Sequence, residues 1–203
     1  CRTVGGAFVM SATPSFSSQR ESVCVPEHAP EPPWTAPIQH GGARLEPLDP
    51  GPISALQLGL RGHEPLRTAL SALGLDLPAA GAAAYAGEGR CLWAGYDHWL
   101  LVGVAAQGLD AHAEVTDQSD SWAVLALPGG DRHAVLARLI PVDFASQAVG
   151  ATIRSELKHI PTLFEVAETA IRIYAPRSYR VTVHHDLATA MQSVAAQAGY
   201  RAG

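Results

Sequence analysis

The chain has no long hydrophobic run, no block of basic residues and no closely spaced cysteine pair. None of its apolar stretches approaches the roughly 20 residues that a membrane-spanning helix needs. Lys and Arg total 14 against 19 Asp and Glu, which gives a formal charge of −5. Without a basic patch, nucleic acid and anionic membranes are not expected as partners.

Cysteine is scarce, with only Cys1, Cys24 and Cys91 in 203 residues. Three widely spaced thiols suit a reducing compartment and argue against a disulfide framework or a zinc ribbon. The opening CRTVGGAFV has one arginine and a short apolar patch broken by glycine, which is too weak for a secretory signal. Met10 is the more natural start. We therefore expect a cytoplasmic protein.

Motifs of catalysis are also scarce. The sequence has no GxSxG elbow, and LPGGDRH lacks the Lys-Ser/Thr pair of a P-loop. His184 and His185 are neighbours, and neighbours on a helix point about 100° apart, so the two cannot share a metal ion. In GYDHWLLVGV, Asp97 and His98 precede Trp99, and polar residues before an apolar strand favour a hairpin corner over a catalytic dyad. We predict no catalytic, cofactor-binding or metal-ligating residue in the chain.

The first 52 residues differ in composition from the rest, because they hold nine of the 15 prolines and many serines. Such a segment cannot maintain a helix and offers little to bury, so the sequence predicts an extended tail over residues 1–52. Residues 53–203 are of the size and composition of one globular domain. Trp34, an aromatic residue within the proline-rich segment, is a candidate docking anchor.

An internal repeat organises the domain. Residues 55–78 align with residues 122–145 without a gap, and in each copy a short strand ends at a glycine turn before a helix. Each copy continues into a hairpin, and laying the two hairpins together puts Leu100 on Ile171. A last helical period begins near Val181. We predict an α+β fold in which duplicated β-α-β-β units form antiparallel sheet with helices packed on one side.

Four short elements, in order, resemble the gamma subunit of heterotetrameric sarcosine oxidase. They are a W-x-G-x-D-x-W-L-L element, a D-Q-S element, a P-x-D element after the second helix, and an R-S-Y element at the final helix, found at 93–101, 117–119, 141–143 and 177–179. The resemblance covers about residues 53–200. That family in turn resembles the folate-binding domain of the glycine-cleavage aminomethyltransferase, which implies the same duplicated fold.

The resemblance implies a non-catalytic structural subunit of a four-chain flavoenzyme. That enzyme oxidatively demethylates sarcosine (N-methylglycine) to glycine, giving 5,10-methylenetetrahydrofolate or formaldehyde, with hydrogen peroxide. The implied partners are the alpha, beta and delta subunits, which would carry FAD, FMN, NAD, tetrahydrofolate and zinc, and no cofactor is expected in this chain.

Strand tryptophans could stack a flat pterin or flavin, but at such positions they are more often core or interface residues. Together with the positions that the family elements mark, they give the interface candidates Trp34, Trp93, Trp99, Asp117, Arg177 and Tyr179. Three alternatives stay open: a free-standing folate-dependent one-carbon transferase, a subunit of a related oxidase for another N-methylated amine, and an adaptor unrelated to amine oxidation. The stretch GATIRSELKHIPTLF replaces the acidic, glycine-rich hairpin of the aminomethyltransferase, which argues against the transferase.

Overall fold

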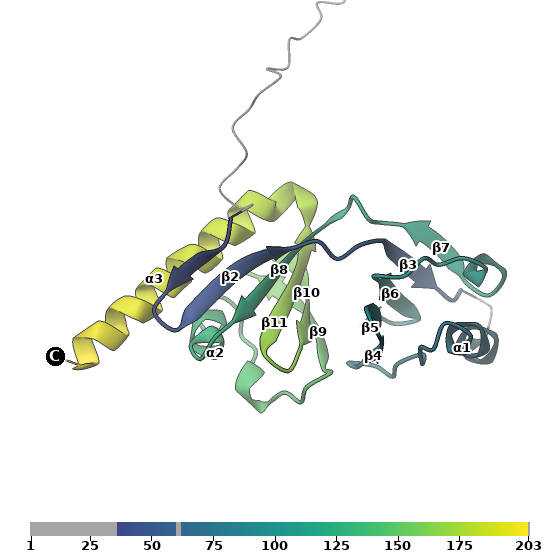
Figure 1. Cartoon of the computed structure of the whole chain (residues 1–203), viewed down its shortest axis with the longest axis horizontal. Coiled ribbons are helices and arrows are strands. Elements are labelled where there is room, and N and C mark those ends of the chain that lie inside the picture. The colour runs from purple at the N-terminus through teal and green to yellow at the C-terminus, as the bar shows by residue number, and fades with distance from the viewer. Residues whose placement is uncertain (1–35, 60–61, 203) are drawn as a thin grey trace, which may run out of the picture. The chain divides into compact units, whose positions relative to one another are not determined.

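The computed structural model describes residues 36–59 and 62–202. Contacts divide the chain into two units, residues 1–30 and 31–203, and the described residues belong to the second. Its elements, drawn in Figure 1, are β1 (Ile38–His40), β2 (Ala43–Leu48), β3 (Ile53–Gln57), α1 (His63–Ser71), β4 (Ala83–Ala86), β5 (Gly89–Gly95), β6 (His98–Val102), η2 (Leu109–Ala111), β7 (Glu114–Asp117), β8 (Trp122–Pro128), α2 (Arg132–Leu136), η3 (Phe144–Ser146), β9 (Thr152–Leu157), β10 (Ile160–Val166), β11 (Ala170–Pro176), η4 (Arg177–Tyr179) and α3 (Arg180–Ala202).

The strands form two antiparallel sheets. The first sheet has the order β4-β5-β6-β3-β7, and the second has the order β1-β2-β8-β11-β10-β9. The α+β class predicted from the sequence is confirmed at this level. The predicted β-α-β-β unit is one strand short, because β4 and β9 each add a strand after the helix.

The two halves of the domain, residues 53–102 and 122–176, have the same element order and strand order. The order β3-β6-β5-β4 in the first sheet corresponds to β8-β11-β10-β9 in the second. The strand that precedes each half lies in the sheet of the other half: β2 leads into β3 but pairs with β8, and β7 leads into β8 but pairs with β3. Two crossover segments, between β2 and β3 and between β7 and β8, therefore join the sheets.

Side chains alternate between two buried faces in the central strands, as the two-residue period of a strand requires. In β6, Trp99 and Leu101 pack in one cluster with α1, whereas Leu100 and Val102 pack between the sheets. The second sheet buries its other face against α2 and α3. Each fully buried leucine contributes roughly 1.5–3 kcal/mol through removal of apolar surface from water.

The final helix confirms the helical segment predicted to begin near Val181. Val183, Leu187 and Met191 are fully buried against the second sheet, whereas Val181 is 49% exposed. The helix begins at Arg180 after the short turn of η4, so the local preference of VTV for a strand is overridden by packing. Figure 1 shows α3 beside β1 and β2.

The prediction of an extended tail over residues 1–52 is wrong for residues 38–48, which form β1 and β2. Ala43 and Leu45 are buried in the core of the second sheet. Pro47 lies in the part of β2 that pairs with β8 alone. Because β1 does not extend that far, the lack of an N–H at Pro47 costs no hydrogen bond to β1. Short proline-rich strands carry too few alternating apolar residues to stand out from a coil in the sequence. Trp34 lies outside the described residues.

Candidate functional site

The hairpin between β5 and β6 separates the side chains of Asp97 and His98. Asp97 has a φ of +48°, a left-handed turn conformation that Asp tolerates better than most residues. Its Oδ1 lies 3.0 Å from His63 Nε2 on α1, whereas His98 lines a different cavity with Arg154. Burial, followed by the charge of Arg154, lowers the pKa of His98. The structure places the two residues in a hairpin corner, and the contact of Asp97 with His63 was not predicted from the sequence.

A cavity of about 440 Å³ opens beside this corner, and we call it the hairpin hollow. It is lined by Trp93, Tyr96, Asp97 and Trp99 of the hairpin together with residues of α1 and the segment after it. Trp99 is only 4% exposed, and its Nε1–H donates to the carbonyl oxygen of Pro78 at 3.1 Å. Trp99 is therefore mainly a core residue. Tyr96, which is 90% exposed, is the hairpin's outermost aromatic side chain.

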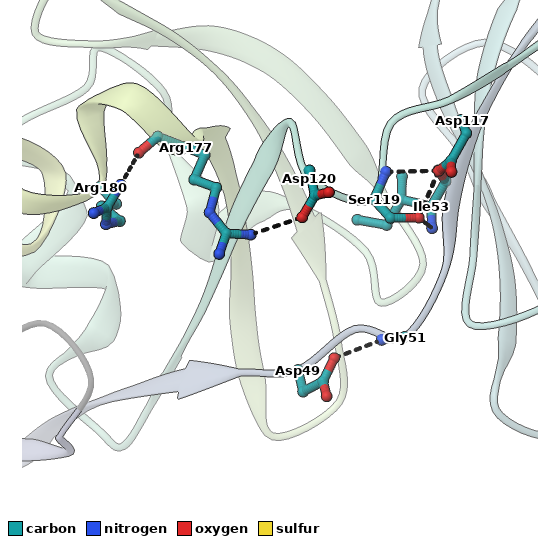
Figure 2. Close-up of polar contacts among 8 residues, drawn as sticks. All are labelled: Asp49, Gly51, Ile53, Asp117, Ser119, Asp120, Arg177 and Arg180. Atoms are coloured by element: carbon teal, nitrogen blue, oxygen red, sulfur yellow. Dashed lines mark hydrogen bonds and ion pairs between the residues drawn. The ribbon is translucent and has the colours of Figure 1, made fainter. Parts of the chain in front are cut away.

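The D-Q-S element forms the turn of the crossover between β7 and β8 (Figure 2). Asp117 Oδ1 accepts from the N–H of Ser119 at 3.0 Å and from its hydroxyl at 2.6 Å. These two hydrogen bonds, the hydroxyl one first, lower the pKa of Asp117. Ser119 Oγ also accepts from the N–H of Ile53 at 3.1 Å, which fixes the start of β3. The element thus builds a turn that ties both crossovers together.

The other crossover repeats this turn in simpler form. Asp49 Oδ1 accepts from the N–H of Gly51 at 3.0 Å, and no further side-chain bond is drawn to it in Figure 2. A cavity of about 500 Å³, the crossover hollow, lies between the two turns. Arg177 lines this hollow, and its Nη1 lies 3.5 Å from Asp120 Oδ1 at the surface. This ion pair contributes little to stability, because water screens it.

Among the sequence-predicted residues, Trp93 and Trp99 meet in the hairpin hollow, and Arg177 borders the crossover hollow. Asp117 stabilises the turn at Ser119 by hydrogen bonds, and Tyr179 on η4 is 48% exposed. The structure does not bring these five residues into one site. Their participation in an interface stays a prediction.

A buried polar cluster between the sheets was missed by the sequence analysis. Glu165 on β10 is fully buried, accepts from the hydroxyl of Tyr174 at 2.7 Å and forms an ion pair with Arg172. Glu165 and Arg172 are direct cross-strand partners in the β10–β11 hairpin. An acid in LFEV and a base in AIRIY, equally far from the turn, are the sequence signal that could have revealed the pair.

The first sheet contributes Tyr85 and Arg90 to the same region. Burial, and after it the charge of Glu165, raises the pKa of Tyr85 to about 12. Burial, and after it the charge of Glu165, also raises the pKa of Tyr174. A cavity of about 270 Å³ reaches the cluster from the surface; its polar lining is Tyr85, Glu88, Arg90, Glu168 and Arg172. We call it the arginine cavity.

Metal ligands, membrane spans and reactive thiols are the remaining features to consider in the described residues. In this part of the chain no three or more His, Cys, Asp or Glu side chains gather into a group that could hold a metal ion. The described helices include none with the length and apolar character to cross a bilayer. Burial raises the pKa of the Cys91 thiol to about 12, so that thiol stays protonated within the core.

Comparison with solved structures gives an informative match. The architecture is an α+β fold of two antiparallel sheets, and it is similar to a chain of the heterotetrameric sarcosine oxidase from Corynebacterium sp. U-96, solved in complex with pyrrole 2-carboxylate. The similarity has a TM-score of 0.66 and 26% sequence identity, and it covers 78% of this chain and 88% of that chain. No family model matches the sequence, and no curated protein matches it.

Proposed function

We propose that this chain is a gamma-type structural subunit of a heterotetrameric flavoenzyme that oxidatively demethylates sarcosine. The observation that carries the proposal is the similarity to a sarcosine oxidase chain at 26% identity over most of both chains. The aligned region is a larger share of that chain than of this one, so the matched chain is the shorter of the two. A small matched chain suits the gamma position better than the larger alpha and beta subunits expected for the family.

The surface of the domain offers aromatic side chains that suit contacts with another protein. Tyr96 is 90% exposed at the hairpin hollow, beside the partly exposed Trp93. Exposed aromatic side chains next to a hollow are typical of interface anchors, because they bury a large area with little loss of side-chain freedom. We place the contact with a partner subunit at the hairpin hollow.

Co-expression with the alpha, beta and delta chains of the same source tests the proposal. We expect a complex of equal stoichiometry that carries flavin and oxidises sarcosine, measured by size-exclusion chromatography, mass spectrometry and hydrogen peroxide release. A well-folded chain that stays alone in the presence of all three partners contradicts the proposal. Sarcosine and other N-methylated amines, compared on the complex, distinguish the sarcosine enzyme from a related oxidase.

The position of the contact has a matched test. Y96A and Y200A each remove a tyrosine that is 90% exposed, the first at the hairpin hollow and the second on α3. We expect Y96A to weaken assembly about tenfold or more and Y200A to leave it unchanged, because truncation of an interface anchor costs more than 1 kcal/mol. Equal effects of the two variants contradict the placement.

The transferase alternative is tested on the isolated chain. Titration with tetrahydrofolate, followed by calorimetry, should show no binding if the chain is a structural subunit. Tight binding favours the transferase.

A further inference from the structure

The arginine cavity has an arrangement of charges that neither a structural role nor the fold explains. At its inner end lies Arg172, whose ion-pair partner is the fully buried Glu165, and these two charges balance each other. Arg90 lines the same cavity from β5, and its Nε–H is buried without a hydrogen-bond partner. In the described part of the chain no carboxylate forms an ion pair or hydrogen bond with Arg90. Arg90 therefore has no directly paired carboxylate, and its Nε–H is an unsatisfied donor.

Such a donor is costly unless an acceptor reaches it. A buried polar group without a partner loses its hydration and gains nothing in return, roughly 1–3 kcal/mol per group. A guanidinium also offers a fork of donors that matches a carboxylate with two parallel hydrogen bonds. The inner end of the cavity is thus chemically suited to a carboxylate.

The outer end of the cavity has the opposite charge. Glu88, in the turn between β4 and β5, and Glu168, in the turn between β10 and β11, are both exposed and line the cavity. Two rim carboxylates disfavour a simple anion, because it would enter against their repulsion. They favour an entering group that carries a positive charge of its own. The sequence of charges from inside to outside, basic and then acidic, matches a zwitterion.

From this geometry we propose that the arginine cavity binds a small zwitterionic amino acid. Its α-carboxylate lies on Arg90, its ammonium group lies toward Glu88 and Glu168, and Tyr85 forms one wall. The cavity volume of about 270 Å³ is below the roughly 300–1,000 Å³ of pockets for drug-sized ligands, so the side chain of the amino acid is small. This inference does not depend on the proposed function.

Glycine is the probe, and the Arg90 Nε–H signal in a ¹H–¹⁵N spectrum of the full chain is the readout. We expect glycine to shift that signal in a saturable way. Acetate, which has only the carboxylate, and methylammonium, which has only the cation, should each bind at least about fivefold more weakly at matched ionic strength. No saturable shift with glycine, or acetate binding as tightly as glycine, overturns the proposal.

Three variants assign the site, with circular dichroism to check that each is folded and calorimetry to measure glycine affinity. R90Q should weaken glycine binding about tenfold or more, since a charge-assisted pair is lost. The double variant E88Q/E168Q should bring the affinity for glycine close to that for acetate. R44Q is the control, because Arg44 is half-exposed and paired with Glu46 on β2, away from the cavity. Equal glycine affinity in R90Q and R44Q overturns the proposal.

A second measurement covers the case in which R90Q is folded only with its partners. Equilibrium dialysis of radiolabelled glycine against the co-purified complex should count one site fewer with R90Q than with the wild-type chain. An equal count in both complexes overturns the proposal. Failure of the chain to assemble with oxidase subunits contradicts the proposed function alone, since glycine binding is then measured on the chain itself.

Discussion

The two halves of the domain share a topology but differ in what their central hairpins place between the sheets. The β5–β6 hairpin of the first half points Leu92 and Leu100 into the space between the sheets. The β10–β11 hairpin of the second half points Glu165 and Arg172 there. The same fold therefore tolerates an apolar pair or an ion pair at this layer, provided that the charges are cross-strand partners and neutralise each other.

The outer layers differ in the same sense. The first sheet is covered by α1, with Leu66 and Leu70 as its buried residues. The second sheet is covered by α2 and the long α3. Its core includes an edge-to-face pair, Phe144 and Phe164, whose ring centroids are 5.2 Å apart. The more fully covered second half can hold a buried charge pair, while the first half leaves aromatic side chains at its surface.

The largest expected effect comes from breaking the ion pair of the second half. R172M leaves Glu165 fully buried without its cation, so we expect a loss of roughly 3 kcal/mol or more in the free energy of unfolding, measured with urea. R154M is the control, because Arg154 donates to the carbonyl oxygen of Ala94 and has no carboxylate partner among the described residues. The double variant E165L/R172M should recover part of the loss. If R172M is as stable as R154M, the pair does not support the second half.

The next effect is in the first half, where W99F removes the hydrogen bond to Pro78 and leaves a gap beside α1. We expect a loss of about 2 kcal/mol, because the indole donor is removed, the carbonyl oxygen of Pro78 is left without it, and part of an aromatic side chain is lost. Chemical unfolding followed by circular dichroism measures it. Y96F, at the exposed tip of the same hairpin, should be neutral.

The two crossovers give a smaller, direct comparison. S119A removes the acceptor of the Ile53 N–H as well as a bond within the turn, so we expect a loss of about 1 kcal/mol. D49A removes a single bond within the equivalent turn and should cost less. Equal losses from the two variants would mean that the hydrogen bond between Ser119 and Ile53 of β3 does not contribute to stability.

The smallest expected effect is a change in how the stability of the fold declines at acidic pH. Burial, followed by the charge of His185, lowers the pKa of His184. A histidine with a lowered folded-state pKa favours the neutral form, so its stabilising contribution is present above the ordinary pKa of about 6.5 and is lost as the pH falls below it. H184Q should therefore flatten the decline in stability between pH 7 and pH 5. H98Q should do the same in the first half.

Much of this fold follows from the sequence because its strands end at strong turn signals. The glycine turn after β8 and the repeated strand-helix order are readable from spacing alone. The register of the hairpins is not. The alignment that puts Leu100 on Ile171 is wrong by one residue, since Leu100 faces the other sheet and Ile171 faces the helices. When both faces of a strand are buried, no polar residue marks its phase, and a slip of one residue exchanges the faces.

The candidate sites divide in a similar way. The tryptophans and the D-Q-S turn are visible in the sequence because rare residues form local patterns. The arginine cavity is not visible, because Arg90 and Arg172 are 82 positions apart and belong to different sheets. Only the packing of the two sheets brings them together, and the sequence of a single strand does not reveal that packing.

The exchange of β2 and β7 between the sheets has a consequence for the origin of the chain. Each sheet takes a strand from the segment that leads into the other half. An ancestor with a single copy would have had to borrow that strand from a second molecule, as a domain-swapped dimer does. Gene fusion would then have turned an intermolecular exchange into an intramolecular one, and neither half expressed by itself should complete its sheet.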